Sequence, residues 1–228
     1  MAKSQYPVNG KFGKDFKVPA GGDYGYRFHP IRKENIHHNG VDLWGAKEPL
    51  LIEAWHDGEV TVVATNMASF GNYVVIRSKV GKVWITSLYA HLKAPSKLKK
   101  GQKVEAGTVV GIMGATGPVT GKHLHFEIGK GKVHPFLFGG DGKRYYNPLK
   151  FVRATIKAEE AAAEQAQATA EASRASVAPK EGDVIQTTPV ASLKPEDAAK
   201  LPEKQPVKPP AKKPVSKRPA AKRPNKGA

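Results

Sequence analysis

The run Thr120-Gly121-Lys122-His123-Leu124-His125-Phe126-Glu127-Ile128 decides how the whole chain is interpreted. Apolar and polar residues alternate along it, which predicts a half-buried β-strand whose apolar face consists of Leu124, Phe126 and Ile128. The other face carries His123, His125 and Glu127. Two imidazoles at i and i+2 on one strand can serve a single metal centre, either as two ligands or as one ligand beside an acid–base group.

Two earlier segments supply further donors of the same kind. The segment 37–42, His-His-Asn-Gly-Val-Asp, contains a His-x-x-x-Asp spacing, and the segment 87–92, Ser-Leu-Tyr-Ala-His-Leu, adds another histidine. Imidazole nitrogen and carboxylate oxygen suit Zn²⁺, and a catalytic zinc site typically has three protein ligands and one position left to water. The set that meets this count is His38, Asp42 and His125. His91 and His123 remain as two imidazoles that the ligand count does not require.

Two neighbouring residues have alternative interpretations. His37 is the one rival to His38, but only His38 gives the His-x-x-x-Asp spacing. Glu127 shares a strand face with His125, so it either orients that imidazole or is exposed, and we expect it to be exposed.

The three histidine-containing segments, in this order, resemble the lysostaphin-type zinc endopeptidases that cut peptidoglycan peptides. The lead-in 25–31, Gly-Tyr-Arg-Phe-His-Pro-Ile, and the later Asn147-Pro148 fit the same pattern, so the resemblance covers about residues 20–150. It implies that His38, Asp42 and His125 bind the zinc ion and that His91 and His123 are the catalytic histidines. One departure is Lys122, which precedes His123 where the family usually has proline, and which bears on loop shape and substrate preference.

Other enzyme classes lack their signatures in this sequence. The chain has no cysteine, which excludes disulfides, thiolate nucleophiles and cysteine-ligated zinc. No His-Glu-x-x-His helix or Gly-x-Ser-x-Gly elbow is present, and no pair of converging carboxylates indicates a glycosidase.

The chain up to Arg153 is predicted to form one mainly β domain, residues 1–153, with an antiparallel, sandwich-like sheet. Short β-branched runs occupy 50–54, 58–64, 72–77 and 83–89, and Val80-Gly81-Lys82 separates the last two as a hairpin turn. No helix-length apolar pattern interrupts them, which favours antiparallel pairing. Glycines recur at short intervals over 98–114, which is typical of tight β corners.

The composition changes after this domain. Residues 154–176 are rich in Ala, Glu and Gln with almost no large aliphatic residue, which predicts a solvated helical spacer. Residues 177–228 are rich in Pro, Lys and Ala, which predicts a disordered basic tail. The net charge of the 228 residues is +17, with 37 Lys and Arg against 20 Asp and Glu. Such a charge favours a polyanionic partner, for which anionic wall polymers and, as a further alternative, nucleic acid are candidates.

These observations lead to one functional hypothesis and one alternative. We expect a monomeric Zn²⁺ metalloendopeptidase that hydrolyses stems or cross-bridges of bacterial peptidoglycan, as a phage endolysin or a virion-associated lysin with antimicrobial action. The first ten residues have no apolar run of the kind found in signal peptides, and no stretch is long enough to span a bilayer. We therefore expect the chain in the host cytoplasm before lysis, or in the virion. The alternative is a non-catalytic wall-binding or virion structural module of the same fold.

Overall fold

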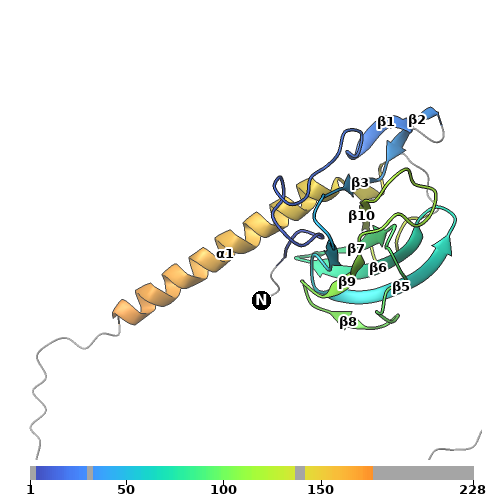
Figure 1. Ribbon diagram of the computed structural model, residues 1–228. Coiled ribbons are helices and arrows are strands. Elements are labelled where there is room, and N and C mark those ends of the chain that lie inside the picture. Colours follow the sequence, from blue (N-terminus) through green and yellow to red (C-terminus); the bar gives the residue numbers. More distant parts are fainter. Residues whose placement is uncertain (1–3, 30–32, 137–141, 177–228) are drawn as a thin grey trace, which may run out of the picture. The chain divides into compact units, whose positions relative to one another are not determined.

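The computed structural model describes residues 4–29, 33–136 and 142–176 of the chain (Figure 1). Its largest element is a seven-stranded sheet with the order β11-β10-β7-β6-β5-β8, in which β3 also pairs with β10. Every pairing in it is antiparallel, which confirms the predicted fold class. The strands are β3 (Gly40–Leu43), β5 (Gly58–Met67), β6 (Gly71–Val80), β7 (Val83–Ala90), β8 (Lys103–Val104), β10 (Leu124–Lys130) and β11 (Tyr145–Tyr146).

Two smaller antiparallel pairs accompany this sheet. The strands β4 (Leu51–Glu53) and β9 (Val109–Ile112) pair with each other, and β9 comes from the glycine-rich segment whose spacing indicates tight corners. The strands β1 (Gly25–His29) and β2 (Glu34–His38) form a hairpin that the sequence patterns did not predict. The second strand of this hairpin ends at His38, so the hairpin positions one of the candidate ligands.

The strand β10 lies at the centre of the fold because both of its edges are paired. One edge pairs with β7, and the other edge pairs first with β3 and then with β11. Its predicted apolar residues, Leu124, Phe126 and Ile128, are completely buried. Within the register, His125 stands opposite Asp42 of β3 and opposite Ala90 of β7. The sheet itself therefore brings Asp42, His125 and the residue that precedes His91 side by side.

The helix α1 (Pro148–Ser176) follows the sheet and confirms the predicted C-terminal helix. It begins at Pro148 rather than at 154 because its first turns carry apolar side chains. Val152 is fully buried in the core, and Phe151 and Ile156 pack against it. From 160 to 174 every residue is exposed, as expected for a polar helix. The predicted basic tail, 177–228, lies outside the described residues. Among the described helices, none has the length and apolar character needed to cross a bilayer.

Candidate metal centre

Donor atoms from the three strands β2, β3 and β10 lie close together. His38 is the last residue of β2, Asp42 lies in β3, and His125 lies in β10. His38 Nε2 lies 3.0 Å from His125 Nδ1 and 3.3 Å from Asp42 Oδ1, and His125 Nδ1 lies 3.0 Å from the same carboxylate oxygen. Among the described residues, these three form the one group whose donor atoms could hold a metal ion together.

The donor types and their spacing fit Zn²⁺. A tetrahedral zinc site with bonds of about 2.0–2.2 Å to nitrogen and oxygen places neighbouring donors about 3.3 Å apart. The observed separations of 3.0–3.3 Å are close to that value. Two imidazoles and one carboxylate also complete the three-ligand set of a catalytic site, in which the fourth position is left open.

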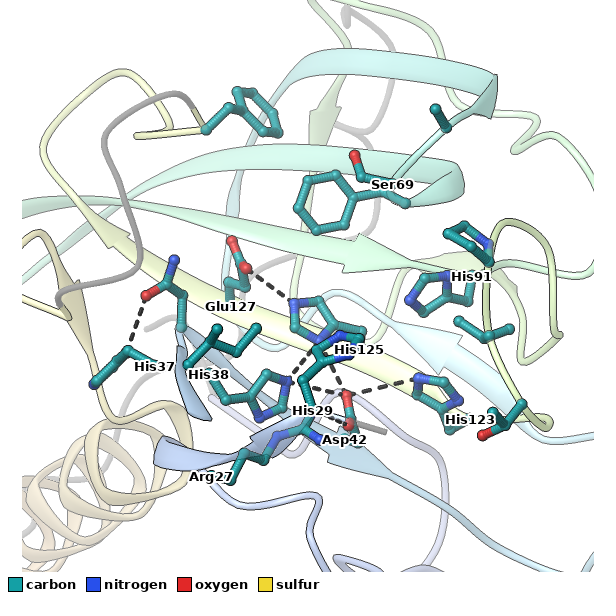
Figure 2. A pocket seen from close by; sticks show the side chains of 18 of the residues that line it. Arg27, His29, His37, His38, Asp42, Ser69, His91, His123, His125 and Glu127 are labelled. Carbon is teal, nitrogen blue, oxygen red and sulfur yellow. Dashed lines mark hydrogen bonds and ion pairs between the residues drawn. The ribbon is translucent and has the colours of Figure 1, made fainter. Parts of the chain in front are cut away.

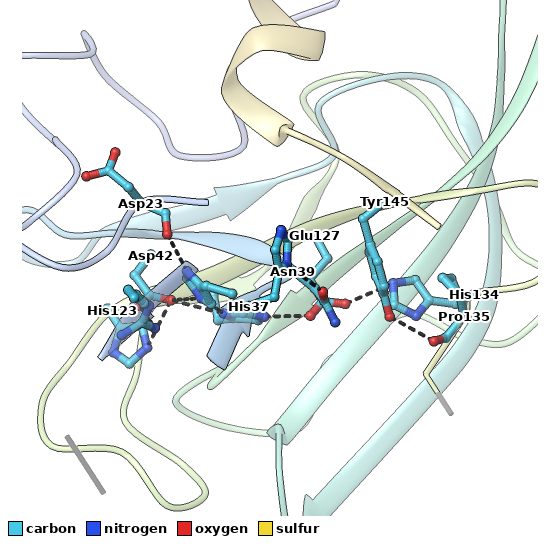
Figure 3. A network of polar contacts seen from close by, with 12 residues as sticks. Asp23, His37, Asn39, Asp42, His123, Glu127, His134, Pro135 and Tyr145 are labelled. Atoms are coloured by element: carbon cyan, nitrogen blue, oxygen red, sulfur yellow. Dashed lines mark hydrogen bonds and ion pairs between the residues drawn. The ribbon is translucent and has the colours of Figure 1, made fainter. Parts of the chain in front are cut away.

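Each of these three side chains has a second partner that fixes its orientation (Figure 2 for Arg27 and Glu127, Figure 3 for Asp23). His38 donates from Nδ1 to the carbonyl oxygen of Asp23 at 2.8 Å. Arg27 donates from Nη2 to Asp42 Oδ2 at 3.1 Å. His125 donates from Nε2 to Glu127 Oε1 at 2.9 Å. Partners of this kind hold metal ligands in position, and the nitrogen or oxygen left over on each side chain faces the common point.

Glu127 is buried, which corrects the expectation that it is exposed. It is 4% exposed, and its second carboxylate oxygen lies 3.2 Å from Nε2 of the buried His134 (Figure 3). Burial alone would raise the pKa of Glu127, but the hydrogen bond from His125 and the close contact with His134 lower it to about 2. Glu127 is thus a charged carboxylate that positions His125. The sequence pattern missed His134 because nothing in the spacing of residues 127 and 134 indicates a contact.

The two histidines without a ligand role lie beside the three donors, as expected. His91 donates from Nδ1 to the carbonyl oxygen of Thr116 at 2.8 Å, and His123 donates from Nδ1 to the carbonyl oxygen of Gly121 at 2.9 Å. Their rings are 4.9 Å apart between centroids, and His123 Nε2 lies 3.6 Å from Asp42 Oδ1. In both rings the anchored Nδ1 leaves Nε2 as the nitrogen available to a substrate.

Burial and charge set the protonation of these side chains. Burial, followed by repulsion from His125, lowers the pKa of His91 to about 4, so this imidazole is neutral at pH 7. Burial also lowers the pKa of His38. For Asp42, burial would raise the pKa, but hydrogen bonds from His125 and His38 hold it well below its usual range. For His125, burial would lower the pKa, but hydrogen bonds to Asp42 and Glu127 raise it to about 10.

The neighbouring histidine His37 lies outside the donor group. Its Nδ1 contacts Asn39 Oδ1 at 3.1 Å, and its ring packs edge-on against Tyr24 with 4.8 Å between centroids. Of these two adjacent histidines, His38 is therefore the one that lies in the donor group. All five residues named from the sequence come together at one place.

A cavity of about 880 Å³ opens over this group and includes Asp42, His91, His123 and His125 in its lining. Apolar side chains, including Phe70, Val119 and Phe136, line other parts of it. A peptide of several residues therefore has room beside the two histidines and the three donors.

Comparison with known proteins identifies relatives of this domain. Residues 36–136 match the model of the family described as Peptidase family M23. Over 128 residues the chain is 38% identical to the peptidoglycan DD-endopeptidase ShyA of Vibrio cholerae, covering 56% of this chain and 27% of ShyA. Over 104 residues it is 38% identical to the DD-carboxypeptidase/endopeptidase Mpg of Neisseria meningitidis, covering 46% of this chain and 23% of Mpg. The chain thus spans about a quarter of the length of these relatives.

A solved structure is similar to the same part of the chain. The catalytic domain of the prophage-encoded M23 protein EnpA from Enterococcus faecalis, crystallised as a point mutant, is 31% identical in sequence. The similarity covers 60% of this chain and 92% of that domain, with a TM-score of 0.45.

Proposed function

The chain belongs to peptidase family M23, and from this premise we propose that it is a zinc metalloendopeptidase that hydrolyses peptide bonds in bacterial peptidoglycan. The observation that carries the proposal is the convergence of His38 Nε2, Asp42 Oδ1 and His125 Nδ1 within 3.0–3.3 Å of one another, with His91 and His123 beside them. A structural or purely wall-binding role would not require this combination of an open three-donor set and two free imidazoles.

In this proposal His38, Asp42 and His125 hold the zinc ion. When bound, Zn²⁺ supplies Lewis acidity toward the scissile carbonyl and lowers the pKa of water to about 7. The second partners Asp23, Arg27 and Glu127 keep the donors pointed at the common site, so the chain does not have to reorganise when the ion binds.

We assign proton transfer to His91 because its protonation state suits a base. Its Nδ1 proton is held by Thr116, it is neutral at pH 7, and its Nε2 is free to accept a proton from the attacking water. The same nitrogen then returns the proton to the leaving amine. A positioned histidine of this kind contributes about 10²–10⁴-fold to the rate.

We assign stabilisation of the oxyanion to His123, whose Nε2 lies 3.6 Å from Asp42 Oδ1 and so borders the donor group. This role requires a proton on both ring nitrogens, one donated to the carbonyl oxygen of Gly121 and the other to the oxyanion. Loss of one such donor costs about 10²–10³-fold in rate in comparable sites. His91 and His123 therefore take separate tasks at the two ends of the scissile bond.

The bond that we propose as the target is a D,D cross-link between stem peptides. The support for this choice is the 38% identity to ShyA and Mpg, whose names describe DD-endopeptidase activity. Mass analysis of fragments released from defined muropeptides tests it. Release of products cut at the D,D cross-link is the expected result, and cleavage only at a glycine bridge would contradict it.

Dye release from purified cell walls tests the enzyme assignment. The wild type should release dye, whereas His91→Ala and His125→Ala should each release less than about 1% as much. His56→Gln is the matched control, because His56 contacts Asp57 and lies beside Glu159 of α1 rather than at the site. Equal release by wild type, His91→Ala and His125→Ala would favour the non-catalytic alternative.

We further propose that the chain acts as a phage lysin, released at lysis or carried in the virion. The support is its net charge of +17, because a strongly basic chain adsorbs to anionic wall polymers as soon as it can reach them. Produced in a bacterial cytoplasm, the chain should leave cells intact until the membrane is permeabilised. Lysis without permeabilisation would contradict this localisation.

A further inference from the structure

A second cavity, of about 590 Å³, adjoins the candidate metal centre. Arg27, Asp42 and His123 line both this cavity and the larger one described above. A bound chain that passes from one cavity to the other therefore passes Asp42 and His123, which border both cavities. The volume lies within the range of about 300–1,000 Å³ that is usual for ligand sites.

One wall of the second cavity is a lysine fixed against a tryptophan. The backbones of Lys17 and Trp44 exchange two hydrogen bonds of 2.8 Å, which hold the two residues opposite each other. The Lys17 ammonium lies 5.8 Å from the centroid of the Trp44 ring, which is 37% exposed. Among the described residues, Lys17 forms no ion pair with a carboxylate. Its charge is therefore free to bind an anion at the edge of the cavity.

The lining of the same cavity includes Lys122, which comes directly before His123 in the sequence. Its ammonium pairs with Glu48, whose side chain is 59% exposed. Exposed ion pairs of this kind contribute little free energy, about 0–1 kcal/mol, so a ligand carboxylate can replace Glu48 at small cost. Lys122 is thus a second cation available to the cavity.

The balance of charge in this cavity is positive. The lining includes one acidic residue, Asp42, and three basic residues, Lys17, Arg27 and Lys122. The charge of Asp42 is already shared among contacts with Arg27, His38 and His125. The larger cavity differs, because Phe70, Val119 and Phe136 contribute apolar wall there. The two ends of the groove therefore favour different parts of a substrate.

We propose that this second cavity binds a carboxylate carried by the substrate residue next to the scissile amide, with Lys17 and Lys122 as specificity-determining residues. The inference rests on the proposed function. It fits a cross-link in which the carbon bonded to the scissile nitrogen also carries a carboxylate, as in a diamino dicarboxylic acid. The two ammonium groups bind the carboxylate, and the Trp44 ring packs against the carbon chain of the same residue. A glycine bridge offers no such carboxylate.

Two D,D-cross-linked muropeptides that differ only at this carboxylate test the proposal. One carries the free carboxylate and the other the carboxamide. For wild type we expect kcat/KM to be about tenfold to a hundredfold higher on the free carboxylate, mainly through a lower KM. In the double variant Lys17→Gln/Lys122→Gln this ratio should fall to about one. The double variant Lys17→Arg/Lys122→Arg should keep most of it, because the positive charge remains.

The matched control is Lys79→Gln/Lys99→Gln, two exposed lysines that line neither cavity, and it should keep the wild-type ratio. Thermal melting of all variants establishes that they are folded. Equal cleavage of both muropeptides by wild type would overturn the inference and leave the proposed function standing, whereas cleavage of neither would overturn both. If the glutamine variant keeps the ratio but loses binding to a soluble polyglycerol phosphate, the cavity binds a wall polymer and the inference is wrong.

Discussion

His125 donates from Nε2 to Glu127 Oε1 at 2.9 Å, and this bond turns its other nitrogen, Nδ1, toward Asp42 and His38. Glu127 is held in turn by His134 on its far side. The result is a buried row of side chains that fixes both the tautomer and the ring orientation of one candidate ligand. The geometry of the candidate metal centre therefore depends on a carboxylate that is not one of its three donors.

Replacing Glu127 should weaken zinc binding without removing a ligand. We expect Glu127→Ala to lower the affinity for Zn²⁺ by about 10–100-fold, since His125 loses the partner that orients it. Glu127→Gln keeps a hydrogen-bond acceptor and should have a smaller effect. Competition against a chromogenic chelator measures the dissociation constants. Glu59→Gln, on a different strand of the same sheet, is the control, and an unchanged affinity in folded Glu127→Ala would refute the orienting role.

Zinc should stabilise the folded chain through the three donors. At a free zinc concentration about 100 times the dissociation constant, binding to the folded state alone adds about 2.7 kcal/mol to the free energy of unfolding. We expect differential scanning calorimetry to show this gain for wild type and its reversal by a chelator. Asp42→Ala should lose the gain, whereas Glu34→Gln, an exposed acid in β2, should retain it. A zinc-dependent increase in melting temperature in Asp42→Ala would contradict the ligand assignment.

The convergence of the three donors could be predicted from sequence because its signals are local. Alternation along 124–128 identified the buried side of β10, and the spacing of His38 and Asp42 matches two strands that follow one another directly. The burial of Glu127 could not be predicted in this way. Alternation distinguishes the two faces of a strand, but it does not reveal that the second face is also covered, here by His134 from a loop beyond the strand.

Two features of the fold were not predicted from the sequence, namely the hairpin of β1 and β2 and the start of helix α1. The reasons differ. The hairpin of β1 and β2 presents Tyr26 and Phe28 to solvent, with 76% and 57% of their surfaces exposed, so its apolar residues do not follow the pattern of a core strand. The helix α1 begins before the change in composition because Val152 belongs to the core and Phe151 packs against it. Composition marks where a helix becomes polar, not where it starts.

The stability of the metal-free chain should depend on pH through His91. Its pKa in the folded chain is about 4, against about 6.5 when unfolded, so between these values the unfolded chain binds a proton that the folded chain does not. This contribution is fully present above pH 6.5 and is lost as the pH falls toward 4, at about 1.4 kcal/mol per pH unit, or about 3 kcal/mol in all. Denaturant unfolding in the presence of a chelator measures it. Between pH 6.5 and pH 4, the free energy of unfolding of His91→Gln should fall by about 3 kcal/mol less than that of wild type. A difference between the two proteins that stays constant over this pH range would rule out the shift in the pKa of His91.

Gly40 allows β3 to approach β10 closely enough for Asp42 and His125 to meet. A Cβ atom at this position would lie 2.6 Å from the carbonyl oxygen of Phe126 and 2.9 Å from His125 Cε1. We therefore expect Gly40→Ala to push the two strands apart, to destabilise the fold by about 1–3 kcal/mol, and to weaken zinc binding because the donors separate.

The matched control is Gly121→Ala, where a Cβ atom would meet nothing within 4 Å and the backbone is not in the left-handed region. Thermal melting and chelator competition measure both effects on the two variants. If Gly40→Ala binds zinc and melts as wild type does, then close packing of β3 on β10 is not what holds Asp42 against His125.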